Sequence, residues 1–488
     1  MMQEWECGSL LRRDSAVIAA IGAGTFAFAF QVSTLLAIMP TLGNFLRRPF
    51  STDWALTVYL LFLSALLITF GRAGDLLGTR RVYMTGLIGF SAASILCALA
   101  TLPLLFLVGR ALEGVGAAMC AANSPAILSR NVGPRHLGRA LGWQAAGTYL
   151  GLTLGPMIGA YTVTRFCWRA VFLLEIPIAL IAVILSAFAI PADTSTRTGK
   201  SHMSVFETVV WMLGLLPLLL ALDRSSEWGW LSLKIAGLLA VSLIACAIFV
   251  RSELRRTSPL LDVRMFTEES FSVPVTAEFL FYLALYALAY LVPMLVVRGR
   301  GMPAAWAGIL LTTQSLMRMV VAPASGMLAD RLGARRVLSI GVPLLFAAIL
   351  ILVSATSVGS IMTFLVASGL IGLGTGSFVP ANSTRFLSAV APERRAVASG
   401  VLATARNLGM MFGVAAAAAS YSNSVAAVKG PLKILGGIRW SLSIPFLAVG
   451  TIILLNVITN RGLGFVEGRK GKAQETAPGA DSTLPSAI

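Results

Sequence analysis

The chain has 488 residues, of which 57% are hydrophobic and 12% are charged, and its formal net charge is +17. Soluble domains carry roughly 25% charged residues, so this composition excludes an ordinary soluble protein and indicates an integral membrane protein. A large positive charge is also typical of nucleic-acid binding, but here the charges lie in short segments between apolar blocks, as in membrane proteins. We therefore expect a lipid bilayer as the partner and no nucleic acid.

The apolar blocks predict the number of membrane crossings, because each crossing helix needs about 20 mostly apolar residues. Fourteen blocks follow one another, at 16–42, 53–72, 82–101, 103–129, 138–161, 168–190, 205–222, 232–251, 270–297, 304–327, 336–354, 359–385, 396–420 and 440–460. The first is too long for a removable signal peptide and lacks a small-residue cleavage site, so we keep it as a membrane helix. The sequence predicts an all-α integral membrane protein with fourteen transmembrane helices.

The basic residues predict the orientation. With an even number of crossings both termini lie on one side, and that side collects most of the Lys and Arg residues between the blocks, whereas the opposite loops hold fewer. Positive charge is retained on the cytoplasmic side. We expect a multi-pass protein of the plasma or inner membrane with both termini in the cytoplasm, ending in a disordered polar tail over 461–488.

A short polar segment occurs twice, as GRAGDLLGTRR at 71–81 and GMLADRLGARR at 326–336. The shared residues are Gly71, Asp75, Gly78, Arg80 and Arg81, which recur 255 positions later as Gly326, Asp330, Gly333, Arg335 and Arg336. FLVGRALEGVG at 106–116 also returns as FLVASGLIGLG at 364–374. We therefore predict two parallel six-helix repeats with two inserted helices. The expected parts are 1–190, 191–264 for the inserted pair, 265–460, and the tail.

Parallel six-helix repeats are typical of one class of transporters, in which the substrate path lies between the halves. The polar segments join the second and third helices of each half. Their glycines permit a tight turn, and the aspartate can accept hydrogen bonds from free N–H groups at a helix start. A simple turn explains the glycines but not the whole pattern. We therefore expect Asp75 and the neighbouring arginines to form a gate that latches the cytoplasmic ends of the two halves, an interpretation that rests in part on a resemblance to a known family.

These segments resemble the loop of the major facilitator superfamily, G-x-x-x-D-x-x-G-R-R/K. GRALEGVGAA at 109–118 is similar to the family's second motif. GTYLGLTLGPMIGA at 147–160 looks like its proton-driven exporter motif, represented by Gly151, Gly155, Pro156 and Gly159. CWRAVFLLEIPIAL at 167–180 and ARNLGMMFG at 405–413 resemble the fourteen-helix drug:proton antiporter branch. That branch commonly places an acidic residue nine positions before a proline in the first helix, but FQVSTLLAIMP has Gln31 there, which cannot carry a proton.

Arg110 and Glu113 lie three positions apart within one apolar block, so they can share a helix face and neutralise each other. An ionisable group at the membrane centre costs roughly 2.5 to 3.5 kcal/mol on insertion scales. One interpretation is a purely structural pair. The second half keeps the surrounding motif with Ser368 and Ile371 at the two positions, which favours a functional role, because the scaffold can form without the charges.

Four further ionisable residues are candidates for the proton or substrate site. Glu278 has no basic residue within four positions, and it is either a protonatable group facing the cavity or a solvated group near the interface. Glu175 lies in the sixth block. Arg318 and Arg406 either pair with Glu113 or Glu175 or bind an anionic substrate. The resemblance favours a structural or gating part for Arg406.

The leading hypothesis is a secondary active exporter that exchanges protons for hydrophobic or amphipathic small molecules. In one version of this hypothesis the small molecules are cationic. The sequence has no phosphate-binding loop for ATP, so the proton gradient is the expected energy source, and no cofactor is expected. The alternative is a lipid or metabolite exporter, or a uniporter, of the same fold. An enzyme is not expected, because both histidines lie in loops and the sequence shows no Ser-His or metal-binding constellation. A non-transporting sensor or receptor of the same architecture is a further alternative. We expect a monomer.

Overall fold

The computed structural model describes residues 2–42, 45–46, 54–193, 205–256, 260–356, 360–426 and 431–457. These residues form fourteen labelled α-helices and no strand, so the all-α fold class is confirmed. The helices are α1 Met2–Leu42, α2 Trp54–Leu77, α3 Thr79–Leu99, α4 Pro103–Asn131, α5 Leu137–Arg165, α6 Trp168–Ala189, α7 Val205–Trp228, α8 Leu233–Arg255, α9 Glu269–Pro293, α10 Ala304–Leu332, α11 Ala334–Ala355, α12 Ile361–Ala389, α13 Arg395–Ala426 and α14 Pro431–Ser441. After a turn at Leu442 the chain is helical again over 443–457. The predicted tail, 461–488, lies outside the described residues.

Twelve described segments are long and apolar enough to cross a membrane. α5 and α10 are not among them, although each has 29 residues. At 1.5 Å per residue, each extends about 44 Å, which is enough to cross. Both helices are diluted by glycine and polar residues, and they pack against each other between the two halves. Their glycine and polar residues lower the mean hydropathy, although each helix is long enough to cross.

The helices extend beyond the apolar blocks. α2 continues to Leu77 and α3 starts at Thr79, so the first polar segment is helical on both sides of Gly78 and is not the loop that the sequence predicted. Gly78 and Gly333 have φ angles of 106° and 88°, which only glycine adopts readily, and these two residues make the turns. Hydropathy detects only the part of a helix that lies in hydrocarbon, and it therefore missed the polar helical ends.

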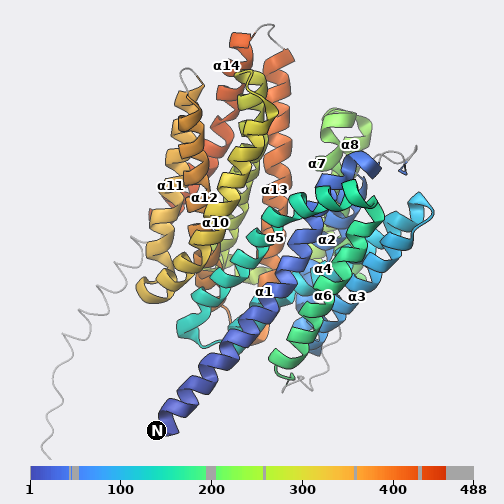
Figure 1. The fold of residues 1–488 in the computed structure, drawn as a ribbon, viewed down its shortest axis with the longest axis vertical. Coiled ribbons are helices and arrows are strands. Elements are labelled where there is room, and N and C mark those ends of the chain that lie inside the picture. The colour runs from blue at the N-terminus through green and yellow to red at the C-terminus, as the bar shows by residue number, and fades with distance from the viewer. Residues whose placement is uncertain are drawn as a thin grey trace, which may run out of the picture.

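The same helix pairs pack in both halves. α1 packs on α5 as α9 packs on α13, α3 on α4 as α11 on α12, and α2 on α4 as α10 on α12. The halves meet through two equivalent pairs, α2 with α13 and α10 with α5. Figure 1 shows two bundles that meet in the lower part of the view and lean apart above. α7 packs on α8, and α7 contacts both α2 and α13, so the inserted pair lies beside the junction.

Candidate functional site

An ion pair lies sealed inside the N-terminal half. Arg110 and Glu113, one turn apart on α4, form the predicted salt bridge, and both side chains are 0% exposed. Arg110 also donates from Nε to the carbonyl of Ala55 on α2 over 2.8 Å, and its guanidinium lies 4.7 Å from the ring centre of Tyr59. The position of the arginine is thus fixed by α2 as well as by its own helix.

A second carboxyl group joins this pair. Ser94 on α3 donates to Glu113 Oε1 over 2.9 Å and is 3.4 Å from Glu175 Oε2 on α6. Thr34 on α1 is 3.4 Å from Glu175 Oε1. Glu175 is buried, like the rest of the cluster. We call Arg110, Glu113 and Glu175 the N-cluster, and it contains two carboxyl groups for one guanidinium.

Gln31 belongs to the same site. Its Nε2 donates to Glu113 Oε2 over 2.9 Å, and the residue is fully buried. Its Oε1 and the Nη2 of Arg110 have no partner among the described residues, so the cluster retains one spare acceptor and one spare donor. The acidic group that α1 lacks at this position is therefore replaced in space by carboxyl groups from α4 and α6.

The glycine motif of α5 holds α1 in place. A side chain at Gly151 would lie 2.6 Å from the carbonyl of Phe26, and one at Gly155 would lie 2.9 Å from that of Phe30. Gly159 faces Thr34 in the same way. The stripe thus lets α1 approach α5 closely enough to place Gln31 and Thr34 beside the carboxyl groups. Pro156 is exposed on the opposite side, within a helix that continues through it.

A different ion pair lies in the C-terminal half. Arg406 on α13 donates from Nε and Nη2 to Glu278 Oε1 on α9, over 2.9 and 2.8 Å. Asn382 on α12 donates to Glu278 Oε2 over 2.8 Å. Glu278 is 0% exposed, so the interpretation of a solvated interfacial carboxyl is wrong. Arg406 pairs with Glu278 and not with Glu113 or Glu175.

Arg318 on α10 adds a second cation near this pair. It donates from Nη2 to Gln314 over 3.0 Å, and its buried Nε has no partner among the described residues. Its guanidinium lies 6.0 Å from the ring centre of Tyr149, which comes from α5 of the other half. We call Glu278, Arg406 and Arg318 the C-cluster, and it contains two guanidinium groups for one carboxyl.

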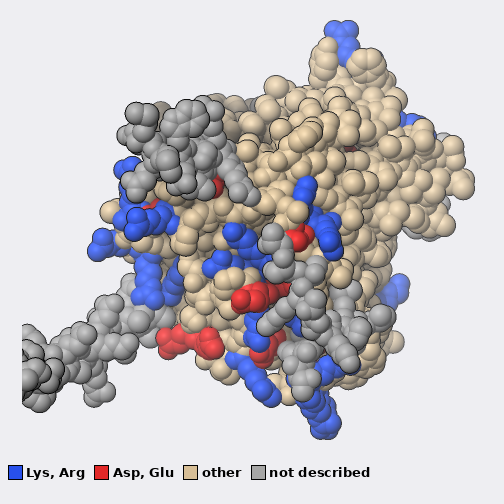
Figure 2. All heavy atoms as spheres, turned by 90° about the horizontal axis from the view of Figure 1, so that it is seen from below, with Lys and Arg blue, Asp and Glu red and all other residues tan. Residues whose placement is uncertain are grey.

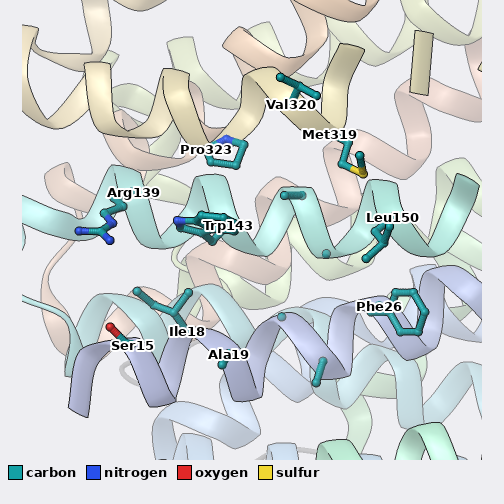
Figure 3. Close-up of a pocket in the computed structure, with 14 residues that line it drawn as sticks. Ser15, Ile18, Ala19, Phe26, Arg139, Trp143, Leu150, Met319, Val320 and Pro323 are labelled. Carbon is teal, nitrogen blue, oxygen red and sulfur yellow. The ribbon is translucent and has the colours of Figure 1, made fainter. Parts of the chain in front are cut away.

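Two cavities lie near these residues. One, of about 100 Å³, lies between the halves and is lined by Gln144, Tyr149, Tyr282, Ser383 and Arg406 among others. It has room for a few water molecules. The other, of about 830 Å³, lies between α1, α5 and α10 and is almost entirely apolar. Figure 3 shows Pro323 of α10 above Trp143 of α5, Met319 above Leu150, and Arg139 at one end.

Asp75 closes one junction between the halves. Its two carboxylate oxygens accept hydrogen bonds from the backbone N–H groups of Ala396 and Val397, at the start of α13. Arg130 on α4 forms an ion pair with Asp75 over 2.7 Å and also donates to the carbonyl of Pro392. Arg395 in turn donates to the carbonyl of Ser129. The aspartate does cap a helix start, but the helix belongs to the other half.

Asp330 closes the second junction in the equivalent way. It accepts hydrogen bonds of 2.7 Å from the backbone N–H groups of Gly138 and Arg139, at the start of α5. We call the contacts of Asp75 with the start of α13 and of Asp330 with the start of α5 the two latches. Both lie at the end of the molecule that carries the two polar segments. The structure therefore has the two halves closed at that end.

Arg80 and Arg81 of the first polar segment do not make these contacts. Arg80 and Arg81 use their backbone N–H groups to bind Asp193, and Arg80 donates to the carbonyl of Ala187 at the end of α6. They therefore brace their own half, which corrects the predicted gating cluster. Among the described residues, Arg335 and Arg336 likewise form no hydrogen bond or ion pair with the N-terminal half.

Glycines bring the closing helices together. A side chain at Gly71 would lie 2.5 Å from the carbonyl of Ala396, and one at Gly400 would lie 2.6 Å from that of Leu67. In the second junction, a side chain at Gly142 would lie 2.5 Å from the carbonyl of Ala322. Gly326 approaches Gly138 in the same junction. Gly71 and Gly326 thus serve helix contact rather than the turn that the sequence predicted.

Several site residues were missed by the sequence. The side chains that contact the N-cluster include Ser94, Thr34 and Tyr59. No sequence motif near these three residues marks them as part of the site. Asn382 was not among the candidates, yet it is fully buried against Glu278. A polar amide within a long apolar block is the signal that was available for it.

The comparisons with known proteins agree with this architecture. The family profile described as Major Facilitator Superfamily matches residues 21–270 and 275–485. Riboflavin transporter RibZ of Clostridioides difficile is 25% identical over 420 residues, covering 85% of this chain and 90% of that protein. Multidrug resistance protein Stp of Mycobacterium tuberculosis is 25% identical over 406 residues, covering 83% and 75%. The solved structure of the proton:xylose symporter XylE has a TM-score of 0.63 at 13% identity, covers 91% and 96%, and shows the shared fold.

Proposed function

Because the chain belongs to the Major Facilitator Superfamily, a family of membrane transporters rather than enzymes, we propose that it exports hydrophobic or amphipathic small molecules in exchange for protons. The protein is a multi-pass membrane transporter. Proton coupling, the export direction and membership of the fourteen-helix antiporter branch are the parts that we propose.

The observation that carries the proposal is the composition of the N-cluster. Two carboxyl groups share one guanidinium in a site that is 0–2% exposed. A buried unpaired carboxylate is strongly disfavoured, so the second carboxyl group holds a proton whenever the site is sealed. Opening the site to water on one side of the membrane then allows this proton to leave. A carboxyl pair with one cation is thus suited to carry one proton per cycle.

The latches supply the alternation. Rocking of one half against the other requires contacts at one end that break as a unit, and Asp75 and Asp330 hold the starts of α13 and α5 by hydrogen bonds that can be broken without unfolding a helix. Release of both latches opens the end that is closed here. A proton gradient supplies the free energy, and each charge that moves across 100 mV contributes roughly 2.3 kcal/mol.

The surface charge supports the proposed orientation. Seen from below, the molecule presents many Lys and Arg side chains and fewer acidic ones (Figure 2). Arg135, Arg139 and Arg394 belong to the end that carries the latches. By the positive-inside rule this end faces the cytoplasm, and so do both termini. The closed end is then the cytoplasmic one.

The uniporter alternative is based on the absence of an acidic residue at position 31. The hydrogen bond between Gln31 and Glu113 weakens this argument, because the same place in the membrane contains an acid from α4. The N-cluster therefore favours proton coupling over facilitated transport.

The test is transport in sealed inverted vesicles with an imposed pH gradient, screened against dyes and amphipathic drugs. Glu113→Gln, Glu175→Gln and Glu278→Gln are compared with Glu269→Gln, an exposed carboxyl on the first turn of α9. We expect Glu113→Gln and Glu175→Gln to lose gradient-driven uptake, and Glu269→Gln to behave as the unmodified protein. Gradient-driven uptake that persists in both N-cluster variants, or uptake that ignores the gradient in the unmodified protein, contradicts the proposal.

A further inference from the structure

We propose that the junction of the halves between Arg318, Tyr149 and Tyr282, here called the chamber, selects compounds that combine an aromatic body with an acidic group, and that Arg318 binds the acidic group. This inference rests on the proposed transport function and specifies the substrate class for the same protein. The substrate that it specifies is an anion, whereas one version of the hypothesis from the sequence had a cationic substrate.

The charge balance of the C-cluster is the first reason. Glu278 is fully occupied, because Arg406 and Asn382 together bind both of its oxygens. Arg406 is thereby neutralised. Arg318 has a side-chain amide as its bonded partner, and no carboxylate within ion-pair distance among the described residues. The chamber therefore holds one uncompensated positive charge, which attracts an anion and repels a cation.

The surroundings of Arg318 supply the second reason. Tyr149 from α5, Tyr282 from α9 and Arg406 line one cavity, and Arg318 lies beside Tyr149. Arg318 is 6.0 Å from the ring centre of Tyr149, and Arg406 is 5.1 Å from that of Tyr282. Tyr282 and Tyr286 lie 6.4 Å apart, centre to centre. Rings next to a cation favour a flat aromatic ligand whose acidic group reaches the guanidinium.

The position of these groups is the third reason. Tyr149 belongs to the N-terminal half, whereas Arg318, Tyr282 and Arg406 belong to the C-terminal half. A ligand that bridges Arg318 and Tyr149 therefore contacts both moving bodies. The cavity of about 100 Å³ is lined by Tyr149, Tyr282 and Arg406, and Arg318 lies beside Tyr149, outside its lining. It is also smaller than the roughly 300 to 1,000 Å³ of small-molecule sites, so the ligand reaches Arg318 when the halves part.

The larger apolar cavity does not offer this chemistry. Its 14 lining residues include one charged side chain, Arg139, at its edge. Apart from Arg139, its side-chain donors are the indole N–H of Trp143 and the hydroxyl of Ser15, and neither carries the charge that would replace the water shell of an acidic group, which disfavours binding there. The charged chamber is therefore the better match to an amphipathic anion.

The experiment uses two probes with the same ring system and opposite charge, pyrenesulfonate and pyrenylmethyl-trimethylammonium. Equilibrium binding to the purified full-length protein in detergent is measured by fluorescence, and gradient-driven uptake is measured in vesicles. We expect the anion to bind more tightly than the cation. Arg318→Gln should weaken binding of the anion by about tenfold or more, since a hydrogen bond to a charged group is lost. Arg318→Lys should bind the anion more tightly than Arg318→Gln does, because the lysine keeps the positive charge.

Arg165→Gln is the matched control, because Arg165 lies 6.0 Å from the ring of Tyr161 but is exposed at the far end of α5. We expect it to bind the anion as the unmodified protein does. Binding in detergent needs no gradient, so it decides the substrate class even when uptake shows no proton coupling. Equal anion binding in Arg318→Gln, or tighter binding of the cation by the unmodified protein, overturns the inference.

Discussion

The N-cluster and the C-cluster differ in charge balance and in access. The N-cluster has two carboxyl groups for one guanidinium and lies sealed within one half, with both members of its ion pair 0% exposed. The C-cluster has two guanidinium groups for one carboxyl, and the Arg406 side chain is 31% exposed beside the junction of the halves. An excess of buried carboxyl groups suits a proton, whereas an excess of accessible guanidinium cations suits an anion. The two clusters thus point to two ligands that bind in different places.

The repeat sharpens this contrast, because the clusters do not occupy equivalent positions. Ser368 and Ile371 stand where the second half would carry Arg110 and Glu113, and both are buried. The fold of a half therefore forms without that ion pair. In α5 the position that corresponds to Arg406 is Thr148, 258 residues earlier. Two copies of one scaffold have acquired different charges for different tasks.

The largest expected effect comes from removing the cation of the N-cluster. Arg110→Gln leaves two carboxyl groups without a positive charge in a sealed site, which should cost about 3 to 5 kcal/mol of stability. Arg406→Gln leaves Glu278 with Asn382 and a path to the junction, so its cost should be smaller. Thermal unfolding in detergent, followed by tryptophan fluorescence, measures both.

Ser368→Ala is the control for the first comparison, because it alters the equivalent buried position of the other half without a change in charge. We expect it to unfold near the temperature of the unmodified protein. If Arg110→Gln proves no less stable than Arg406→Gln, the N-cluster is not the sealed site that the geometry describes.

The second effect separates function from folding. Glu175→Gln removes the excess carboxyl and leaves Arg110 paired with Glu113, so its stability should stay within about 1 kcal/mol of the unmodified protein or rise. Its gradient-driven uptake should nevertheless fall by at least about tenfold, since the site no longer has a carboxyl group to spare. Unfolding and vesicle uptake are measured on the same preparation. A variant that unfolds early would make Glu175 a structural residue instead.

The smallest effect concerns the two latches. Asp75→Asn loses an ion pair with Arg130 and a negative charge at a helix start, which should weaken closure by about 1 to 2 kcal/mol. Asp330→Asn should have a smaller effect, because the contacts of Asp330 are two backbone N–H groups. Spin labels at Arg135 and Glu393, exposed on opposite halves, report the closed fraction as a distance distribution.

The unlabelled latch variants should also fold normally, since helix ends, and not the cores of the halves, are affected. If Asp330→Asn opens the closed end more than Asp75→Asn does, then Arg130 does not contribute to closure in the way that its contacts indicate.

Local patterns were predictable from the sequence, and contacts between distant helices were not. The pairing of Arg110 with Glu113 followed from their spacing on one helix, and the turns at Gly78 and Gly333 followed from the repeated segment. The segment also predicted that its aspartates cap a helix start, but not that this helix belongs to the other half. Glu278 and Arg406 are 128 residues apart, and nothing in either neighbourhood indicates the other. Glu175 joined the N-cluster only through the packing of α6 on α1 and α3. Hydropathy also placed the helix ends too early, because polar helical ends outside the hydrocarbon look like loops.

Proton release on ligand addition is the most direct test of the claim that the N-cluster carries the proton. Purified protein in weakly buffered detergent is mixed with a transported compound, and a soluble pH dye records the change. We predict release of about one proton per bound molecule from the unmodified protein and from Glu269→Gln, and none from Glu175→Gln. Equal release from Glu175→Gln would place the proton elsewhere and contradict the account.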